Sequence, residues 1–318
     1  TSLPARGLFH DDPFCIGITG SYTTEVGHEL LADADLIIAV GSSLAYHFGG
    51  GGQLWPKAEL FHVDVDPLAV SQGQEVASHH LRADARLGVE ALTEAVPTNE
   101  QPWRSEAIAE RIRSSKPDSH AFEVEPDRLD PRDVVEALEA ELPVTWEMVN
   151  SSGHCSGFFA HMPSRPQEKF LTIREFGAIG NGTSFAMGVA AARPNSPVVL
   201  FDGDGSLLMN IQELETIRRH NLNILIVVMN DGAYGSEVHK LRKEGLSEEG
   251  SVFGYGDFAG IAKGFELAGH RVTDLNDIPK LVSEFAEHGG AAVWDFHVSD
   301  KVVSSVMRRA HAQPAKRS

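Results

Sequence analysis

The chain has 318 residues and a formal net charge of -18 at pH 7, which argues against nucleic acid or an anionic membrane surface as its partner. Its length allows one large or two medium domains, each with its own hydrophobic core. No run of about twenty apolar residues and no charged-then-apolar start predicts a membrane span or a signal peptide. Cys15 and Cys155 are the two cysteines. They provide no disulfide framework, which favours a cytoplasmic location, and we expect both to be buried apolar residues.

The first part of the chain, residues 1–97, alternates predicted helices and strands. A helix from Tyr22 to Ala34 precedes apolar runs at 36–40 and 59–65, which are typical of buried parallel strands. A second helix is expected from Arg86 to Ala95, with these side chains facing inward: Leu87, Val89, Leu92 and Val96. The order predicts a doubly wound, mainly parallel sheet that is incomplete, because no strand precedes the first helix.

Two stretches of this region lack a regular apolar period. Gly49 to Gly52 let a backbone lie close to a nucleotide. A flexible loop is the simpler interpretation, because no GxGxxG motif follows a strand. Residues 98–130 are rich in proline, charged and polar residues, apart from a short amphipathic helix around 106–112. We interpret 98–130 as an interdomain linker.

A second doubly wound α/β domain is predicted from residue 131 to about 305, followed by a polar tail at 306–318 that contains Arg308, Arg309, Lys316 and Arg317. Its first helix begins with Pro131. The other expected helices are 183–192, 207–217, 258–262 and 278–288, and the expected strands are 144–149, 170–173, 197–201, 223–229, 266–272 and 291–298. The glycine-bearing stretch 233–256 is interpreted as a mobile lid.

The most informative stretch of this domain runs from residue 197 to 232. An apolar strand ends in Gly203-Asp204-Gly205-Ser206, a helix follows, and a second apolar strand ends in Asn230-Asp231-Gly232. A strand–helix–strand crossover brings both strand ends to the same edge of the sheet. We therefore expect Asp204 and Asn230 to lie side by side at the carboxyl ends of the strands, where such sheets bind ligands.

The chemistry of this pair favours a hard cation. A carboxylate and an amide oxygen suit Mg²⁺, which shares itself with substrate phosphates. The N–H groups of Gly205 and Ser206 at the helix start then face the phosphate oxygens. The alternative is an ordinary Gly-Asp-Gly turn, which the surrounding strand–helix–strand unit and Asn230 argue against. The stretch predicts a Mg²⁺-bridged diphosphate site.

Gly203-Asp204-Gly205 followed by Asn230 resembles the thiamine-diphosphate signature of the acetolactate synthase and pyruvate decarboxylase superfamily. The resemblance implies that Asp204 and Asn230 are side-chain Mg²⁺ ligands and that Gly232 adds its backbone carbonyl. It also implies cofactor contacts at the following residues: Gly203, Gly205, Ser206, Tyr234, Gly235 and His154. For His154, a solvated loop histidine is an equally good interpretation.

Gly177-Ala178-Ile179-Gly180 resembles the segment that holds the aminopyrimidine ring in this family. By that resemblance Ile179 wedges the cofactor into its bent conformation, and the carbonyl of Gly177 accepts from the 4'-amino group. The alternative is a tight turn before a close-packed helix. Ser184 stands where many synthases have proline, so the subfamily stays open.

The first part of the chain also resembles the family's middle domain, at residues 34–41 and 63–67. That domain binds FAD in some members and nothing in others, so FAD is undetermined. The pyrimidine-binding domain of the family has no counterpart here, and its essential glutamate is missing with it. No catalytic residue is therefore assignable. We expect the isolated chain to be inactive, to bind thiamine diphosphate weakly or not at all, and to need a homo-oligomer or a partner chain that supplies that domain.

Three functions follow from the resemblance. The first is decarboxylation and carboligation of a small-molecule 2-oxo acid, as in acetolactate synthase. The second is another 2-oxo acid decarboxylase, of the benzoylformate or indolepyruvate type, and the third is a non-catalytic module that binds thiamine diphosphate. An assay that tells acetoin-type products from simple aldehydes separates the first function from the second. Loss of Mg²⁺-dependent cofactor binding in Asp204→Ala separates these two from the third.

Overall fold

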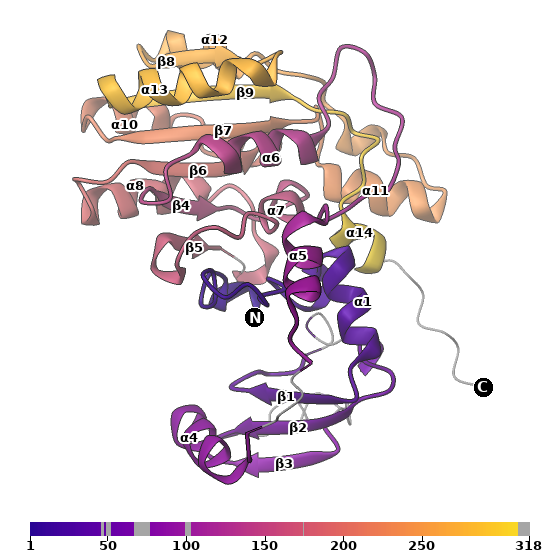
Figure 1. Cartoon of the computed structure of the whole chain (residues 1–318). Helices are drawn as coiled ribbons and strands as arrows, with labels where there is room; N and C mark the ends of the chain where they lie inside the picture. The colour runs from indigo at the N-terminus through magenta and orange to yellow at the C-terminus, as the bar shows by residue number, and fades with distance from the viewer. Residues whose placement is uncertain (46–47, 49–51, 67–76, 99–102, 174, 311–318) are drawn as a thin grey trace. The chain divides into compact units, whose positions relative to one another are not determined.

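The computed structural model describes residues 1–45, 48, 52–66, 77–98, 103–173 and 175–310, and it divides into two compact units, Thr1–Ser119 and His120–Ser318 (Figure 1). Both units are α/β, and all strand pairs in both sheets are parallel, as predicted. The boundary between them falls inside the segment that we interpreted as a linker. Gly49 to Gly51, Lys316 and Arg317 lie outside the described residues.

The first unit contains a three-stranded sheet of order β1-β2-β3. Its strands are β1 (Leu36–Val40), β2 (Glu59–Asp64) and β3 (His79–Arg82), and its helices include α1 (Glu25–Asp33), α4 (Ala85–Ala95) and α5 (Glu106–Ser114), with short 3₁₀ turns η1 (Leu3–Ala5) and η2 (Gly20–Tyr22). Helix α1 begins later than predicted because the side chain of Thr24 caps it, accepting from the N–H of Gly27.

The predicted inward face of α4 is wrong. Leu87, Val89 and Val96 are 54%, 44% and 62% exposed. The helix packs on the sheet through Gly88 instead, where an added Cβ would lie 2.5 Å from a methyl carbon of Val63. Close approach through a glycine leaves Leu87 and Val89 exposed, whereas Leu92, the fourth residue predicted to face inward, is partly buried. Of the two cysteines, Cys155 is buried as expected, whereas Cys15 is only partly buried.

The second unit is built on a six-stranded sheet of order β5-β4-β6-β7-β9-β8 (Figure 1). The strands are β4 (Glu147–Asn150), β5 (Phe170–Thr172), β6 (Val198–Gly203), β7 (Ile224–Asn230), β8 (Ala268–Arg271) and β9 (Ala291–His297). The helices are α6 (Pro131–Glu141), α7 (Cys155–Phe159), α8 (Gly182–Ala192), α9 (Asp204–Met209), α10 (Glu213–Arg219), α11 (Gly235–Glu244), α12 (Phe258–Gly264), α13 (Ile278–His288) and α14 (Ser305–Ala310). Four 3₁₀ turns join them: η4 (Gln167–Lys169), η5 (Glu175–Gly177), η6 (Glu249–Ser251) and η7 (Leu275–Asp277).

Two apolar cores cover the two faces of this sheet. Alternate residues of β6 and β7 point into one core with α6, α7 and α13, and the intervening residues point into the other core with α8, α10 and α12. Central strands that are buried on both faces read as continuous apolar runs, which is why the sequence identified β6 and β7. The carboxyl ends of these two strands lie side by side at one edge of the sheet.

One expectation about this unit needs correction. The helix expected over 207–217 is broken into α9 and α10, because Asn210 ends α9 in a non-helical conformation and its side chain donates to the carbonyl of Gly180. The stretch 233–256 contains helix α11, which ends at Gly245 in the left-handed conformation (φ 66), and its interpretation as a lid stays a prediction.

Candidate functional site

The two predicted metal ligands lie at the carboxyl edge of the central strands. Gly203 of β6 is opposite Met229 of β7, so Asp204 and Asn230 are the next residues on neighbouring strands. Asp204 opens α9 and is 1% exposed, and Asn230 closes β7 and is fully buried. The crossover therefore places a carboxylate and an amide at adjoining strand ends, inside the protein.

The amide of Asn230 is fixed in one orientation. Its nitrogen donates to the carbonyl of Gly256 and to Oδ1 of Asp295, both at 2.9 Å. Because both partners are acceptors, the atom that faces them must be the nitrogen. Its oxygen, Oδ1, is buried and has no hydrogen-bond partner among the described residues. Buried polar atoms are seldom left unpaired, and a free amide oxygen is a suitable ligand for a hard cation.

Asp204 is held by backbone donors. Its Oδ1 accepts from the N–H of Gly205 and its Oδ2 from the N–H of Gly232, both at 2.8 Å. Burial raises the pKa of Asp204 well above its usual range, and the neighbouring Asp231 raises it further. Burial likewise raises the pKa of Asp231. Two buried carboxyl groups that lie close together each raise the pKa of the other, because two negative charges repel. A divalent cation bound beside them would attract both charges and lower both pKa values.

The third predicted ligand, the carbonyl of Gly232, is already engaged. It accepts from the N–H groups of Phe253 and Gly254, at 2.9 and 2.8 Å. These residues belong to the stretch 251–255, called here the cover segment, which also pairs with Ala233 through Val252. A cation that uses Gly232 as a ligand therefore requires the cover segment to shift. Of the three predicted ligands, Asn230 therefore has an unpaired oxygen, whereas the carbonyl of Gly232 is already occupied by two hydrogen bonds.

Aromatic rings cover the start of α9, where the diphosphate was expected. An added Cβ on Gly205 would lie 2.6 Å from the ring of Tyr234 and 3.2 Å from the ring of Phe253. The two rings contact each other edge to face, with centroids 5.2 Å apart. A glycine is thus required at 205 for close approach of a neighbouring group. Gly235 has the same requirement, because its Cβ would lie 2.3 Å from Oδ2 of Asp231.

Ser206 joins α9 to the loop that carries Ile179. Its Oγ accepts from the N–H of Gly180 at 2.9 Å and lies 3.3 Å from Oγ of Ser151. Ile179 is partly buried, and its side chain lies 3.7 Å from the Cβ position of Gly153. Gly177 is exposed and has a φ of 64°. The Ile179 loop is therefore attached to the same strand edge as Asp204.

His154 is buried, so its interpretation as a solvated loop histidine is wrong. Its Nε2 accepts from the N–H of Ser304 at 3.1 Å, which places the ring proton on Nδ1, 3.8 Å from Oδ2 of Asp231. Its ring packs edge to face on His239, with centroids 4.4 Å apart. Burial lowers the pKa of His154 to about 3, so the ring is neutral at pH 7.

Asp231 and Asp295 are polar residues of this edge that the sequence analysis did not single out. Asp295 had a visible signal, since it is the one charged residue in the apolar run Ala291 to Phe296. Its carboxylate is fully buried and contacts Asn230, as described above. A buried charge inside an apolar strand needs a specific partner, which is the argument that could have found it.

Within the described ranges, no group of three or more His, Cys, Asp or Glu side chains is arranged to hold a metal ion. Asp204 and Asn230 together provide one carboxylate and one amide oxygen. Two protein ligands are typical of Mg²⁺, which takes its other ligands from water and from the phosphates of a bound molecule. Among the same described residues, no helix is long and apolar enough to cross a membrane.

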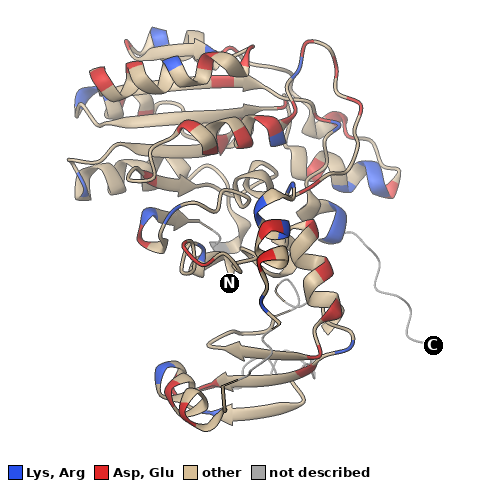
Figure 2. Ribbon diagram, viewed as in Figure 1, with Lys and Arg blue, Asp and Glu red and all other residues tan. Residues whose placement is uncertain are grey.

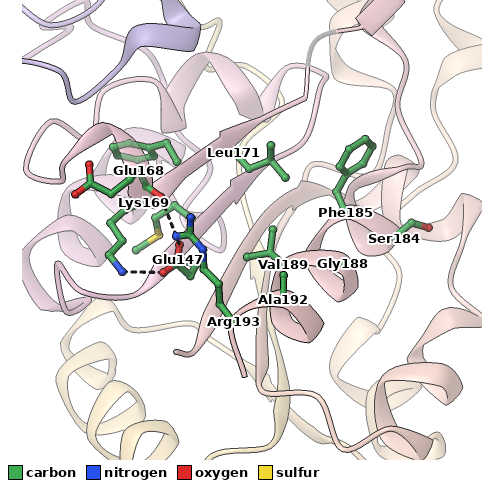
Figure 3. A pocket seen from close by; sticks show the side chains of 12 residues that line it. Glu147, Glu168, Lys169, Leu171, Ser184, Phe185, Gly188, Val189, Ala192 and Arg193 are labelled. Carbon is green, nitrogen blue, oxygen red and sulfur yellow. Dashed lines mark hydrogen bonds and ion pairs between the residues drawn. The ribbon is translucent and has the colours of Figure 1, made fainter. Parts of the chain in front are cut away.

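A cavity of about 560 Å³ lies elsewhere, between β4, β5 and α8 (Figure 3). Lys169 and Arg193 both pair with Glu147 in its wall, and Phe185 and Val189 contribute apolar surface. Glu147 and Phe170 begin their strands, so the cavity lies at their amino ends. None of the predicted cofactor or metal residues lines it, and we do not assign it to the cofactor site.

Comparison with known proteins matches both parts of the chain to one family. The family model described as "Thiamine pyrophosphate enzyme, C-terminal TPP binding domain" matches residues 151–296, and "Thiamine pyrophosphate enzyme, central domain" matches residues 1–92. The large subunit of acetolactate synthase isozyme 2 from Escherichia coli is 27% identical over 292 residues, which are 91% of this chain and 52% of that protein. Acetolactate synthase 1, chloroplastic, from Zea mays is 27% identical over 320 residues, 94% of this chain and 49% of that protein.

The acetolactate synthase large subunit of Parasynechococcus marenigrum is 25% identical over 305 residues, 94% of this chain and 49% of that protein. The chain thus spans about half the length of these curated relatives. The central-domain model matches the first part of the chain and the C-terminal model matches the later part. The C-terminal model covers the strand edge that holds Asp204 and Asn230. The chain belongs to the thiamine-diphosphate-dependent enzyme superfamily.

Proposed function

We propose that this chain carries the diphosphate-binding part of a Mg²⁺-dependent enzyme of the acetolactate synthase type. The substrate class is a small 2-oxo acid, which is decarboxylated and joined to a second carbonyl compound. The observation that supports a metal site most directly is the unpaired, buried Oδ1 of Asn230 beside Asp204, within the region matched by the family's C-terminal domain.

The proposal gives each residue of the edge a task. Asp204 and Asn230 hold the Mg²⁺, and backbone groups of Gly203, Gly205 and Ser206 face the diphosphate at the start of α9. Ile179 and Gly177 hold the pyrimidine ring. Tyr234 and Gly235 contact the cofactor beside the start of α9, and neutral His154 lies against Asp231, the residue that Gly235 closely approaches. When bound, the cofactor supplies the electron sink for carbanion chemistry.

The cover segment sets a condition on this proposal. The carbonyl of Gly232 joins the metal only after the N–H groups of Phe253 and Gly254 release it. The same covered arrangement is what favours the alternative function, a non-catalytic module whose site stays closed. We propose that the cover segment opens and that the protein acts as a homo-oligomer or with a partner chain, because two of the relatives are named as large subunits. Whether FAD binds the first unit is a separate question, which a flavin absorption spectrum answers.

The test is metal binding by the Asp204→Ala variant. Mn²⁺ takes the same oxygen ligands as Mg²⁺ and is observed directly by electron paramagnetic resonance. Because we expect the isolated chain to bind thiamine diphosphate weakly, the cofactor is supplied at millimolar concentration to load the site. Under these conditions we expect the wild-type chain to bind one Mn²⁺ and Asp204→Ala to lose that binding. Glu139→Gln is the matched control, because it also removes a carboxylate that pairs with another residue, in this case buried Arg165. Glu139 lies near the end of α6, and the chain runs from there to the amino end of β4, whereas Asp204 lies at the carboxyl ends of the strands. Equal binding by wild type and Asp204→Ala contradicts the metal assignment.

A further inference from the structure

We propose that Asp295 is a positioning residue that orients the amide of Asn230 so that its oxygen faces the cation. The inference rests on the proposed function, because it concerns the ligand geometry of that same site. Asp295 lies in β9, on the strand next to Asn230, and touches no predicted cofactor residue other than Asn230 among the contacts described above.

The sheet register brings the two side chains together. Asn230 pairs with His297, and Asp295 lies two residues before His297 on β9. Residues two apart on a strand share a face, so Asp295 is the diagonal neighbour of Asn230 on the same face of the sheet. Oδ1 of Asp295 accepts from the Asn230 nitrogen at 2.9 Å. The contact is therefore built into the backbone pairing of β7 with β9.

Asp295 is itself rigidly held. Its Oδ2 accepts from the N–H of Phe258, the first residue of α12, at 3.1 Å, and lies 3.4 Å from Nε2 of His297. A main-chain donor cannot rotate away, so the carboxylate keeps Oδ1 directed at Asn230. The side chain is fully buried.

The arrangement explains why a costly group is present here. A buried carboxylate in an apolar strand is paid for in desolvation, and stability alone favours an apolar residue at that place. An asparagine amide can present either its oxygen or its nitrogen to a cation, and only the oxygen is a ligand. With Asp295 and the carbonyl of Gly256 both accepting, the reversed amide would face its oxygen toward two acceptors. The reversed orientation is thereby excluded.

The first experiment observes the amide directly. In the full chain with ¹⁵N-asparagine, identified by its loss in Asn230→Asp, we expect both side-chain protons of Asn230 to exchange slowly with solvent. In Asp295→Asn one of them should exchange at least about tenfold faster, because one acceptor is weakened, and Glu139→Gln should leave both unchanged. Unchanged exchange in Asp295→Asn overturns the proposal.

The second experiment measures Mn²⁺ affinity in millimolar thiamine diphosphate. We expect Asp295→Asn to bind Mn²⁺ about ten- to a hundredfold more weakly than wild type, the range typical of groups that orient a ligand. The exchanged pair Asn230→Asp with Asp295→Asn restores a donor–acceptor contact, and should bind more tightly than either single variant. A purely structural role predicts no such recovery.

The outcomes separate the two proposals. In one outcome the wild-type chain binds Mn²⁺, Asp204→Ala loses that binding, and Asp295→Asn binds Mn²⁺ with an affinity within twofold of wild type. This outcome overturns the role of Asp295 and leaves the proposed function standing. Absence of Mn²⁺ binding in the wild-type chain overturns the proposed function and this inference together. Thermal unfolding of each variant shows whether the fold is intact. If Asp295→Asn does not fold, the same comparison is made with Asp295→Glu, which keeps the charge but displaces it, and which should also weaken Mn²⁺ binding.

Discussion

The proposed metal ligands Asn230 and Asp204 have environments that leave them few other roles. Each is almost completely buried, and each has its hydrogen-bonding groups assigned to fixed partners except for the one oxygen of Asn230. The sequence indicated both residues, since Gly-Asp-Gly and Asn-x-Gly follow apolar runs. It gave no indication of which way the amide points, because that depends on Asp295, 65 residues further along the chain.

The neutral histidines make a prediction about pH. Burial first, and then repulsion from His154 when that ring is protonated and from the guanidinium of Arg242, lower the pKa of His239 to about 3. In the unfolded chain a histidine takes up a proton near pH 6.5, so between pH 6.5 and about 3 the unfolded state binds more protons and the stability due to neutral His239 falls as pH falls. In His239→Gln the loss of unfolding free energy between pH 7 and 5 should be smaller by about 2 kcal/mol.

Urea unfolding at several pH values measures this difference. His288→Gln is the matched control, since it replaces an exposed histidine of α13. Burial raises the pKa of Asp202 to about 6, so Asp202 makes the folded state more stable as the pH falls. This contribution is the same in wild type and in His239→Gln, and it cancels when their pH curves are compared. Parallel pH curves for wild type and His239→Gln would show that His239 is protonated in the folded state.

At the scale of elements, Tyr255 adds side-chain contacts to the backbone hydrogen bonds that hold the cover segment. The guanidinium of Arg128 lies over its ring, 4.0 Å from the centroid, and the ring of His297 stacks on it with centroids 5.0 Å apart. Its hydroxyl donates to the carbonyl of Val298 at 3.1 Å. The two ring contacts and one hydrogen bond together stabilise the closed position by about 1–2 kcal/mol.

Tyr255→Ala should therefore loosen the cover segment. We expect the amide protons of Phe253 and Gly254, which bond the carbonyl of Gly232, to exchange about tenfold faster in this variant. Val252→Ala is the control, because it trims a 45% exposed side chain in the same segment and keeps Tyr255. Hydrogen exchange followed by mass spectrometry makes the measurement. Equal exchange in wild type and Tyr255→Ala would mean that other contacts hold the segment.

At the scale of the whole molecule, each unit has its own apolar core. Both cores on the faces of the six-stranded sheet contain only residues of the second unit, and the core around Leu60 and Trp55 contains only residues of the first. Acidic side chains occur on the helices of both units (Figure 2). Separate cores are the condition for separate folding.

A fragment of residues 120–310 should accordingly fold alone. We expect it to unfold cooperatively in urea, with a midpoint equal to that of the second-unit transition in the full chain. Far-UV circular dichroism and near-UV signals of Trp146 and Trp294, both buried in this unit, follow the transition. A fragment that lacks near-UV signal or unfolds gradually would mean that the second unit depends on the first.

The sequence by itself determined the α/β class, the parallel central strands and the meeting of Asp204 with Asn230, because strand burial and crossover geometry are expressed in local periodicity and chain order. It misjudged α4, where a single glycine decides the contact face, and it left His154 open between two environments. Only the tertiary structure decided the unpaired oxygen of Asn230, the role of Asp295 and the engaged carbonyl of Gly232. Each of these depends on hydrogen bonds between segments far apart in the chain. The pattern of apolar and polar residues within one segment does not indicate which other segment it will contact.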